Sequence, residues 1–336
     1  MQNNSNFSTE RTSFKLEAQR INAIVYSNSV LLSIGIVGNL ISFFVFLNKT
    51  LRKRKFNWYL LTLTVFKFVF CLFFFIDYIL IAIHKHRLFL HNVQRIFFMI
   101  IDYTIHTSDC CAVVLTLLLS TERLYAIKNP MEIKEFFTNL HAKRTITVSL
   151  LLSIILKTLS YTFCELNFLN KSSILYCSIV SPSLFHVVPS VITLILNGML
   201  AKHMFHVNYH KNGEDEIEMD ELNAGKSSNE IFIHINKKKV SSVIIRTFNK
   251  REKTQTQKSH YIVIFVSSLW STLSSILYYF FNSHFSSDYF KHLSNKLTIL
   301  QSSSSIFFSS NHCINFFTYL LFYSEYRNIL KEFFSR

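Results

Sequence analysis

An acidic residue stands directly beside an arginine at the end of the third long apolar stretch of this 336-residue chain. The two residues are Glu122 and Arg123, and Leu124 follows them. Ionisable residues inside or at the edge of a membrane are costly, and they tend to serve a function. The pair is therefore either a functional contact or an ordinary ion pair at a membrane interface.

Three further ionisable groups lie deep inside apolar stretches. Lys67 is in the middle of the second stretch, Asp109 is in the third and Lys157 is in the fourth. Each needs a polar partner inside the protein, because an unpaired charge in an apolar environment is expensive. For Lys67 the interpretation stays open between a functional cation and a neutral amine that is hydrogen-bonded to nearby asparagines.

Seven apolar stretches must position these groups. About 20 apolar residues are enough to cross a bilayer as a helix. Half of the residues are hydrophobic and only 16% are charged, which is low for a soluble domain. We therefore predict an all-α membrane protein whose spans lie at about 22–47, 57–83, 96–122, 146–166, 179–205, 260–282 and 297–320.

Basic residues indicate which side of the membrane each loop faces. Most of the 35 lysines and arginines lie in the connections after the first, third and fifth spans and in the C-terminal tail. Because basic residues near span ends stay on the cytosolic side, we predict a plasma-membrane protein with an extracellular N-terminus and a cytoplasmic C-terminus. This distribution also explains the net charge of +15, so no nucleic-acid partner is expected.

The segments outside the spans are polar. Residues 1–21 are the predicted extracellular N-terminus, and they lack the apolar core of a cleavable signal peptide. Residues 206–259 join the fifth and sixth spans, and their low hydrophobicity and mixed charge predict a flexible loop. Sequons on the predicted outer side make Asn3, Asn6 and Asn170 candidate N-glycosylation sites.

Several landmarks resemble those of the rhodopsin-like (class A) G-protein-coupled receptors, in the same order. The string 122–131 is similar to the end of the third helix of that family. The string 311–319 is similar to the motif of its seventh helix, with Phe316 in the position of a proline. Gly38 and Asn39 match the Gly-Asn pair of its first helix. The resemblance implies a seven-transmembrane helix bundle over 22–320 and a short amphipathic eighth helix within 321–336.

The resemblance also implies a function. A receptor of this family transmits the binding of an extracellular ligand to a cytosolic heterotrimeric G protein. The seventh-helix string is most similar to that of invertebrate neuropeptide receptors, which favours a peptide ligand. The residues that the resemblance assigns to the activation switch and to G-protein coupling are Glu122, Arg123, Asn311, Asn315 and Tyr319.

The chain departs from the family pattern in the middle of the second span. Lys67 stands where the family has an aspartate that helps to bind sodium, so no allosteric sodium site is expected. We interpret Lys67 and Asn39 as polar residues of the bundle core, with Asn39, Asn311 or Asn315 as the hydrogen-bond partner of the amine. Trp270 resembles the toggle tryptophan of the sixth span, but Thr272 replaces the proline that follows it.

The disulfide of the family cannot form in its usual place. Phe98 occupies the position of the cysteine at the outer start of the third span. Cys177 corresponds to the loop cysteine, and Cys164 lies at the outer end of the fourth span. Both face the oxidising side of the membrane, so we predict a Cys164–Cys177 disulfide.

Polar side chains in the outer half of the bundle are candidates for binding the ligand. Acidic and imidazole groups there would suit a basic or amidated peptide. An alternative is that Asp102 and His106 lie at the wet end of their helix and that Asp109 pairs with an internal donor such as Lys67. The candidate ligand-binding residues are Asp77, Asp102, His106, Asp109, His186 and Trp270.

Two other classes of function compete with signalling. A transporter or channel would have internal repeats, broken helices and paired charges at mid-depth, whereas this chain has no repeat and few deep charges. A seven-helix receptor that has lost coupling is the second alternative, because both late spans lack the usual prolines. No metal site, cofactor or catalytic motif is found, so an enzyme is not expected.

Overall fold

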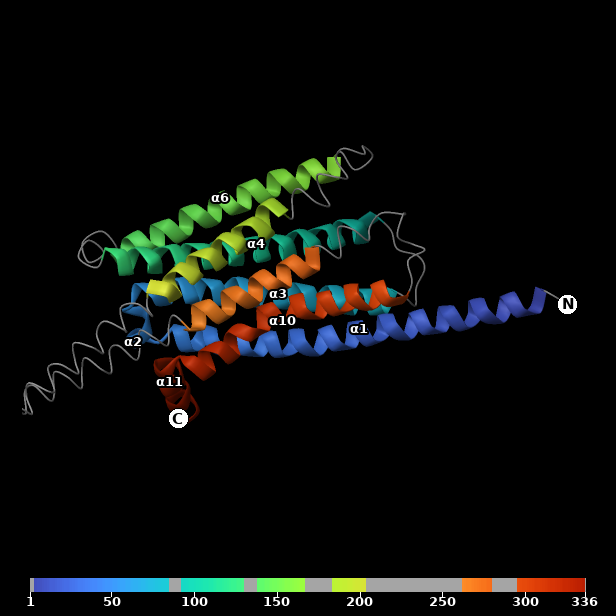
Figure 1. Cartoon of the computed structure of the whole chain (residues 1–336), viewed down its shortest axis with the longest axis horizontal. Helices are drawn as coiled ribbons and strands as arrows, with labels where there is room; N and C mark the ends of the chain where they lie inside the picture. Colours follow the sequence, from blue (N-terminus) through green and yellow to red (C-terminus); the bar gives the residue numbers. More distant parts are fainter. Residues whose placement is uncertain are drawn as a thin grey trace, which may run out of the picture.

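The structure is a computed structural model, and it describes residues 3–84, 92–129, 138–166, 183–203, 262–279 and 295–335. Side chains are described from residue 25 onward, except at position 55 and at several helix ends, including 81–84, 92–95, 165–166, 295–299 and 301–302. The described part is all-α, with helices lying roughly along one axis (Figure 1). Its elements are α1 (Asn3–Phe46), α2 (Lys49–Arg52), α3 (Lys55–His84), α4 (Asn92–Lys128), α6 (Asn139–Leu166), the π-helical turn η2 (Ser183–Val187), α10 (Asn295–Phe322) and α11 (Ser324–Ser335), with further helix up to His203 and over 262–279.

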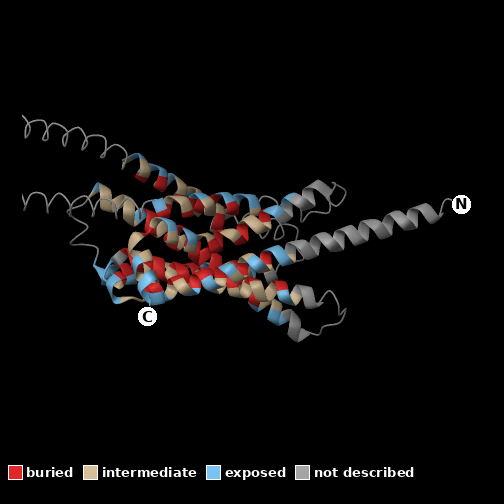
Figure 2. Ribbon diagram, turned by 90° about the horizontal axis from the view of Figure 1, so that it is seen from below, coloured by how far each residue is buried: buried red, intermediate tan, exposed pale blue. Residues whose placement is uncertain are grey.

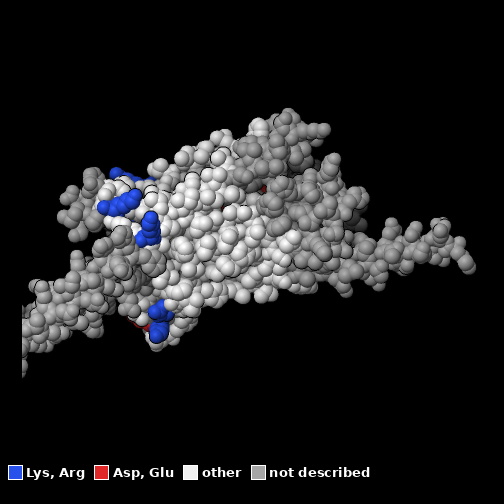
Figure 3. Space-filling view, in the orientation of Figure 1, with Lys and Arg blue, Asp and Glu red and all other residues white. Residues whose placement is uncertain are grey.

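Six helices of the described part are long and apolar enough to cross a membrane. Their apolar side chains face outward as well as inward, and this exposed apolar surface is what a lipid environment requires. Figure 3 shows a broad belt without charged side chains, with lysines and arginines gathered at the end where α2 and α11 lie. The six segments are Val25–Phe46, Phe56–Leu80, Ile96–Lys128, Asn139–Cys164, Leu184–His203 and Ile262–Tyr279.

The seventh expected span, α10, forms a helix of 28 residues but does not belong to this apolar set within the described residues. It carries the run Ser302–Ser305 and several other polar residues, which lower its hydropathy. Several of its polar side chains point inward: Ser304, Ser309, Asn311 and Asn315 are buried, although Ser303 is exposed. Phe317 and Leu321 are exposed on the outer face. The helix is therefore apolar where it faces out and polar where it faces the bundle.

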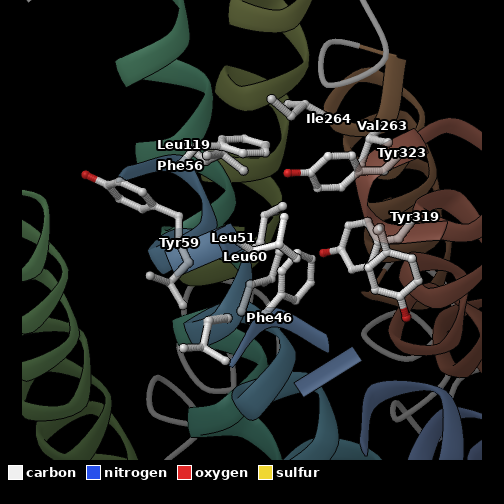
Figure 4. Close-up of a cluster of buried hydrophobic side chains, with 14 of the residues drawn as sticks. Phe46, Leu51, Phe56, Tyr59, Leu60, Leu119, Val263, Ile264, Tyr319 and Tyr323 are labelled. Carbon is white, nitrogen blue, oxygen red and sulfur yellow. The ribbon is translucent and has the colours of Figure 1, made fainter. Parts of the chain in front are cut away.

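The bundle core consists of two apolar clusters with polar residues between them. One cluster lies at the end that contains α2, and it packs Phe46, Leu60 and Tyr319 from three helices (Figure 4). The other packs Leu32, Phe70, Phe308 and neighbouring residues in the opposite half. Figure 2 shows the buried residues running through the middle of the bundle. α1 packs against α3 and α10, and α3 packs against α4, so these four helices hold most of the core.

The predicted eighth helix is present as α11. It begins at Ser324, with only Tyr323 between it and the end of α10 at Phe322, and it turns away from the bundle axis (Figure 1). The Tyr323 hydroxyl donates a hydrogen bond to Asn57 Oδ1 at 3.1 Å, and the hydroxyls of Ser42 and Tyr326 are 2.9 Å apart. Burial raises the pKa of Tyr326 to about 12, so this phenol stays neutral at physiological pH. These contacts fix the start of α11 against α1 and α3.

Two glycines of α1, Gly35 and Gly38, allow neighbouring helices to approach closely. A third glycine, Gly198, has no close neighbours and can serve as the control when these positions are substituted. A Cβ atom on Gly35 would lie 2.6 Å from Cys313 Sγ and 2.7 Å from Cys71 Sγ, and one on Gly38 would lie 2.9 Å from Phe316 Cβ and Cγ. A Cβ on Gly198 would meet nothing within 4 Å.

We predict that Gly35→Ala and Gly38→Ala lower the thermal unfolding temperature in detergent. Overpacking of this kind costs about 1–3 kcal/mol. Gly198→Ala should leave the temperature unchanged or raise it, because alanine is about 1 kcal/mol better than glycine inside a helix. Equal effects of all three substitutions would contradict the close packing of α1.

Candidate functional site

A buried carboxylate lies at the centre of the candidate site. Asp109 on α4 is 1% exposed, and two imidazoles that are fully buried lie against it. His186 Nδ1 is 2.8 Å from Asp109 Oδ2, and His312 Nε2 is 3.3 Å from Asp109 Oδ1. The Tyr279 hydroxyl donates a hydrogen bond to Asp109 Oδ2 at 3.3 Å. We call these four residues the Asp109 cluster, and each comes from a different helical segment.

The imidazole nitrogens lie within contact distance of the carboxylate, but the geometry of these contacts is not that of a hydrogen bond. Neither ring nitrogen of His186 or His312 is aligned for a hydrogen bond within the described residues. The rings are instead oriented by aromatic contacts. His312 stacks on Phe70 with a centroid distance of 3.5 Å, and His186 stacks on Tyr279 at 4.9 Å. Electrostatic attraction to the carboxylate and aromatic packing thus act on the same two rings.

The local backbone explains how His186 reaches the centre. His186 lies in the π-helical turn η2, and Pro189 follows two residues after that turn ends. Proline has no N–H group, so it cannot complete the usual hydrogen bond to the carbonyl four residues earlier. Single π-helical turns of this kind often occur at functional sites. The irregular turn therefore places an imidazole against α4.

Lys67 lies close to this cluster but has a different partner. Its Nζ donates a hydrogen bond to the backbone carbonyl of Asn311 at 2.9 Å, and the side chain is 4% exposed. Asn39 Nδ2 donates to the carbonyl of His312 at 3.0 Å and to that of Gly35 at 2.8 Å. Of the three asparagines named as possible partners of the amine, Asn311 is the one that accepts its hydrogen bond, through the backbone carbonyl and not the side chain. The alternative pairing of Asp109 with Lys67 is replaced by contacts with His186, His312 and Tyr279.

Trp270 joins the helix over 262–279 to α10. Its Nε1 donates a hydrogen bond to Ser310 Oγ at 3.0 Å, and Asn311 Nδ2 donates to Ser271 Oγ at 3.4 Å. Thr272, which stands where the family has a proline, donates from Oγ1 to the carbonyl of Ser190 at 2.8 Å. Polar contacts thus join the helix over 262–279 both to α10 and to the helix that contains Ser190.

A narrow gap lies beside these contacts. It is too small to admit a water molecule, and its lining is mainly hydroxyl-bearing. The lining residues are Val113, Thr116, Ser190, Thr193, Ser268, Ser271 and Thr272. The described part of the bundle is therefore tightly packed around these residues.

Other predicted ligand-binding residues lie apart from the Asp109 cluster. His106 Nε2 is 3.4 Å from Asp102 Oδ1 one turn along α4, and the Asp102 side chain is 55% exposed. Asp77 on α3 is partly buried in the same half of the bundle. The alternative that Asp102 and His106 lie at a wet end of their helix stays a prediction. Whether any of the six candidates contacts a ligand stays a prediction.

Of the predicted switch residues, Glu122, Arg123 and Tyr319 lie toward the end of the bundle that carries the basic side chains, whereas Asn311 lies against Lys67 and Ser271. The Arg123 guanidinium lies over the Phe56 ring with its Cζ 3.9 Å from the centroid, and Glu122 lies beside Tyr59. Asn315 and Tyr319 are buried, and their side-chain polar atoms make no hydrogen bond of good geometry within the described part. Their assignment to a switch stays a prediction.

Cys164 is disulfide-bonded, as expected. Its predicted partner, Cys177, lies outside the described residues, so the pairing itself stays a prediction. The glycosylation candidate Asn170 and the loop 206–259 also lie outside them. Asn3 and Asn6 fall within α1, but their side chains are not described. Within the described residues, no group of His, Cys, Asp and Glu side chains is arranged to hold a metal ion.

Sequence reasoning did not identify His312 and Tyr279 as members of the site. His312 was visible as the second residue of the seventh-helix string, at a position that helical spacing places near Phe308. Nothing in the pattern around Tyr279 distinguishes it from other aromatics of its span. No protein-family model matches this chain, and no curated protein matches it. The family resemblance therefore depends on the motifs and their order.

We predict that the Asp109 cluster stabilises the fold because its imidazoles solvate a buried carboxylate. Replacing both imidazoles, as in His186→Phe with His312→Phe, keeps the aromatic packing but removes the two polar groups that lie against the carboxylate. Leaving a buried polar group without its partners costs about 1–3 kcal/mol, and more when the group is charged, so thermal unfolding in detergent should occur at a clearly lower temperature. Adding Asp109→Asn should recover much of that loss.

The matched control is His106→Phe, because its pair with Asp102 is partly exposed and such pairs contribute only about 0–1 kcal/mol. A triple variant that is no more stable than the double variant would show that the rings act only by packing.

Proposed function

We propose that this integral membrane protein is a G-protein-coupled receptor that transmits the binding of an extracellular peptide to a cytosolic heterotrimeric G protein. The observation that carries the proposal is the way α10 is held. Lys67, Asn39 and Trp270 bind its inner face by hydrogen bonds from three different helices. A helix held by polar contacts can exchange partners with a small displacement, which is how helix bundles switch between packings.

We further propose that α10 is the seventh crossing of the membrane. Its length of 28 residues is sufficient to span the hydrocarbon layer. Its polar side chains are turned into the bundle, and its outer face presents Phe317 and Leu321. A helix of this kind is stable in lipid only when its neighbours cover the polar face, and α1 and α3 do so here.

The signal would travel from the outer half through the Asp109 cluster to α10. Asp77, Asp102 and His106 offer acidic and imidazole groups for a basic or amidated peptide. Asp109 and His186 are too deeply buried to be reached first, so we assign them the role of connecting the ligand end to His312 and α10. Arg123 lies at the opposite end, beside the basic residues, where a G protein would bind.

A test is to express the chain with a promiscuous G protein and to screen a neuropeptide library. At least one peptide should raise the second-messenger signal in a concentration-dependent manner. Arg123→Ala should reduce that response at least tenfold, whereas Arg144→Ala, an exposed arginine near the same end, should not. No response to any peptide, together with unchanged basal activity in Arg123→Ala, would favour a receptor without coupling.

The predicted orientation can be checked separately. Epitope tags at the two ends of the chain should be detected on opposite sides of the membrane, the N-terminal tag on intact cells and the C-terminal tag only after permeabilisation. The measurement is immunofluorescence on intact and permeabilised cells. Two tags on one face would contradict an odd number of crossings and therefore the receptor itself.

One observation favours a transporter as the second candidate. The Asp109 cluster contains buried ionisable groups at the centre of the bundle, as proton relays of membrane pumps do. No internal repeat, which many transporters have, is visible in the sequence. Proton movement by the purified protein in liposomes, abolished by Asp109→Asn, would favour this candidate over the receptor.

A further inference from the structure

Two free thiols from distant parts of the chain meet inside the bundle. Cys71 lies on α3 and Cys313 on α10, and both are buried and unbonded. Their sulfur atoms lie 2.7 and 2.6 Å from one shared point, the position that a Cβ on Gly35 would occupy. The two side chains are within hydrogen-bonding reach of one another. The absence of a side chain on Gly35 creates the space in which the sulfurs meet.

Two polar side chains lie close to the two sulfurs. Asn39 Nδ2 donates toward Cys71 Sγ at 3.9 Å. Lys67 lies one helical turn before Cys71, and residues four apart share a helix face. The amide and the amine are therefore positioned to stabilise negative charge when one of the two thiols loses its proton, and the thiolate is the nucleophilic form of cysteine.

Cys313 is held in position by the backbone. Its Sγ–H is directed at the carbonyl of Leu31 at 3.0 Å and at that of Ser309 at 3.4 Å. The sulfur therefore lies at the contact between α10 and α1, beside Cys71, rather than on the lipid-facing side of the helix.

The other two free cysteines do not share this arrangement. Cys110 and Cys111 are consecutive residues of α4, so the helix points their side chains in directions about 100° apart. They are buried like Cys71 and Cys313, and they provide an internal control for thiol reactivity without cross-helix geometry.

We propose that Cys71 and Cys313 form a redox-sensitive dithiol, which hydrogen peroxide converts to a disulfide that joins α3 to α10. One thiolate attacks a peroxide oxygen, the O–O bond breaks, and a sulfenic acid and hydroxide form. The second thiolate attacks the sulfenic sulfur and displaces its hydroxyl group as hydroxide. The two thiol protons convert the two hydroxides to water, so two thiols and one peroxide give one disulfide and two waters. The sulfurs must then approach to about 2.05 Å.

The bond would have a mechanical consequence. Lys67, which donates to the Asn311 carbonyl, already connects the same two helices by a reversible hydrogen bond. A disulfide at Cys71 and Cys313 would make this connection covalent, so that α10 could no longer move independently of α3. This dithiol requires only the packing of α1, α3 and α10, and not the proposed coupling to a G protein.

The experiment uses the full-length chain with a protease site inserted in the connection between His203 and Ile262. Cleavage leaves an N-terminal fragment that contains Cys71 and a C-terminal fragment that contains Cys313. Cys164 and Cys177 both stay in the N-terminal fragment, so their bond cannot join the two fragments. Membranes are treated with hydrogen peroxide, free thiols are blocked, the chain is cleaved, and the products are separated on a non-reducing gel.

The expected result is that peroxide joins the fragments and a reducing agent separates them. Peptide mass mapping should identify the Cys71–Cys313 linkage. Cys71→Ser and Cys313→Ser should each abolish it, and the double variant Cys110→Ser with Cys111→Ser should leave it intact. Gly35→Ala should reduce the joined fraction at least several-fold without removing either thiol, whereas Gly198→Ala should not.

Two results would overturn the proposal. One is that the fragments of the parent protein separate completely after peroxide treatment, while Cys71 and Cys313 remain reactive toward a thiol reagent after denaturation. The other is that a joined product persists in Cys313→Ser. If Gly35→Ala prevents folding, the serine variants and the mass map still decide between these outcomes.

Discussion

Polar groups that are buried where water is scarce must find their partners inside the protein, and the inner face of α10 shows how this constraint shapes the bundle. This face carries serine, asparagine and histidine side chains at positions that are apolar in an ordinary membrane helix. Each unsatisfied group in such an environment costs several kcal/mol. The indole of Trp270 meets this requirement for Ser310, while the amide of Asn39 and the amine of Lys67 find their own acceptors in backbone carbonyls of α10. The relative positions of four helices follow from these contacts.

The two apolar clusters act together with this polar layer. The cluster around Phe46, Leu60 and Tyr319 closes the end that carries the basic residues, and the cluster around Phe70 and Phe308 closes the other half. Apolar burial is not directional, so it holds the helices together without fixing their rotation. The polar contacts between the clusters are directional, and they fix which face of α10 points inward. The two apolar clusters therefore hold the helices together, and the polar contacts between the clusters determine how α10 is oriented.

The Asp109 cluster differs from the rest of the polar layer in carrying charge. One carboxylate is shared by two imidazoles and one phenol that come from three other segments. A change in any one of these segments alters the environment of the same carboxylate. This is the physical basis for assigning the cluster a connecting role between the outer half and α10. The irregular turn η2 is consistent with that role, because it places His186 at the cluster at the expense of regular helix geometry.

The sequence alone determined that the chain is a bundle of membrane-spanning helices, because about 20 apolar residues in succession are stable in lipid only as a helix. It also showed that Lys67 lies in mid-span and needs a polar partner inside the protein, but the structure decided that this partner is the backbone carbonyl of Asn311. Only the tertiary structure decided which groups meet Asp109, because His186, Tyr279 and His312 are far apart in the chain and no local pattern relates them. It likewise decided that Cys71 and Cys313 face one another across Gly35. The periodicity of a helix indicates which residues can share a face, but the rotation of each helix in the bundle depends on all its neighbours together.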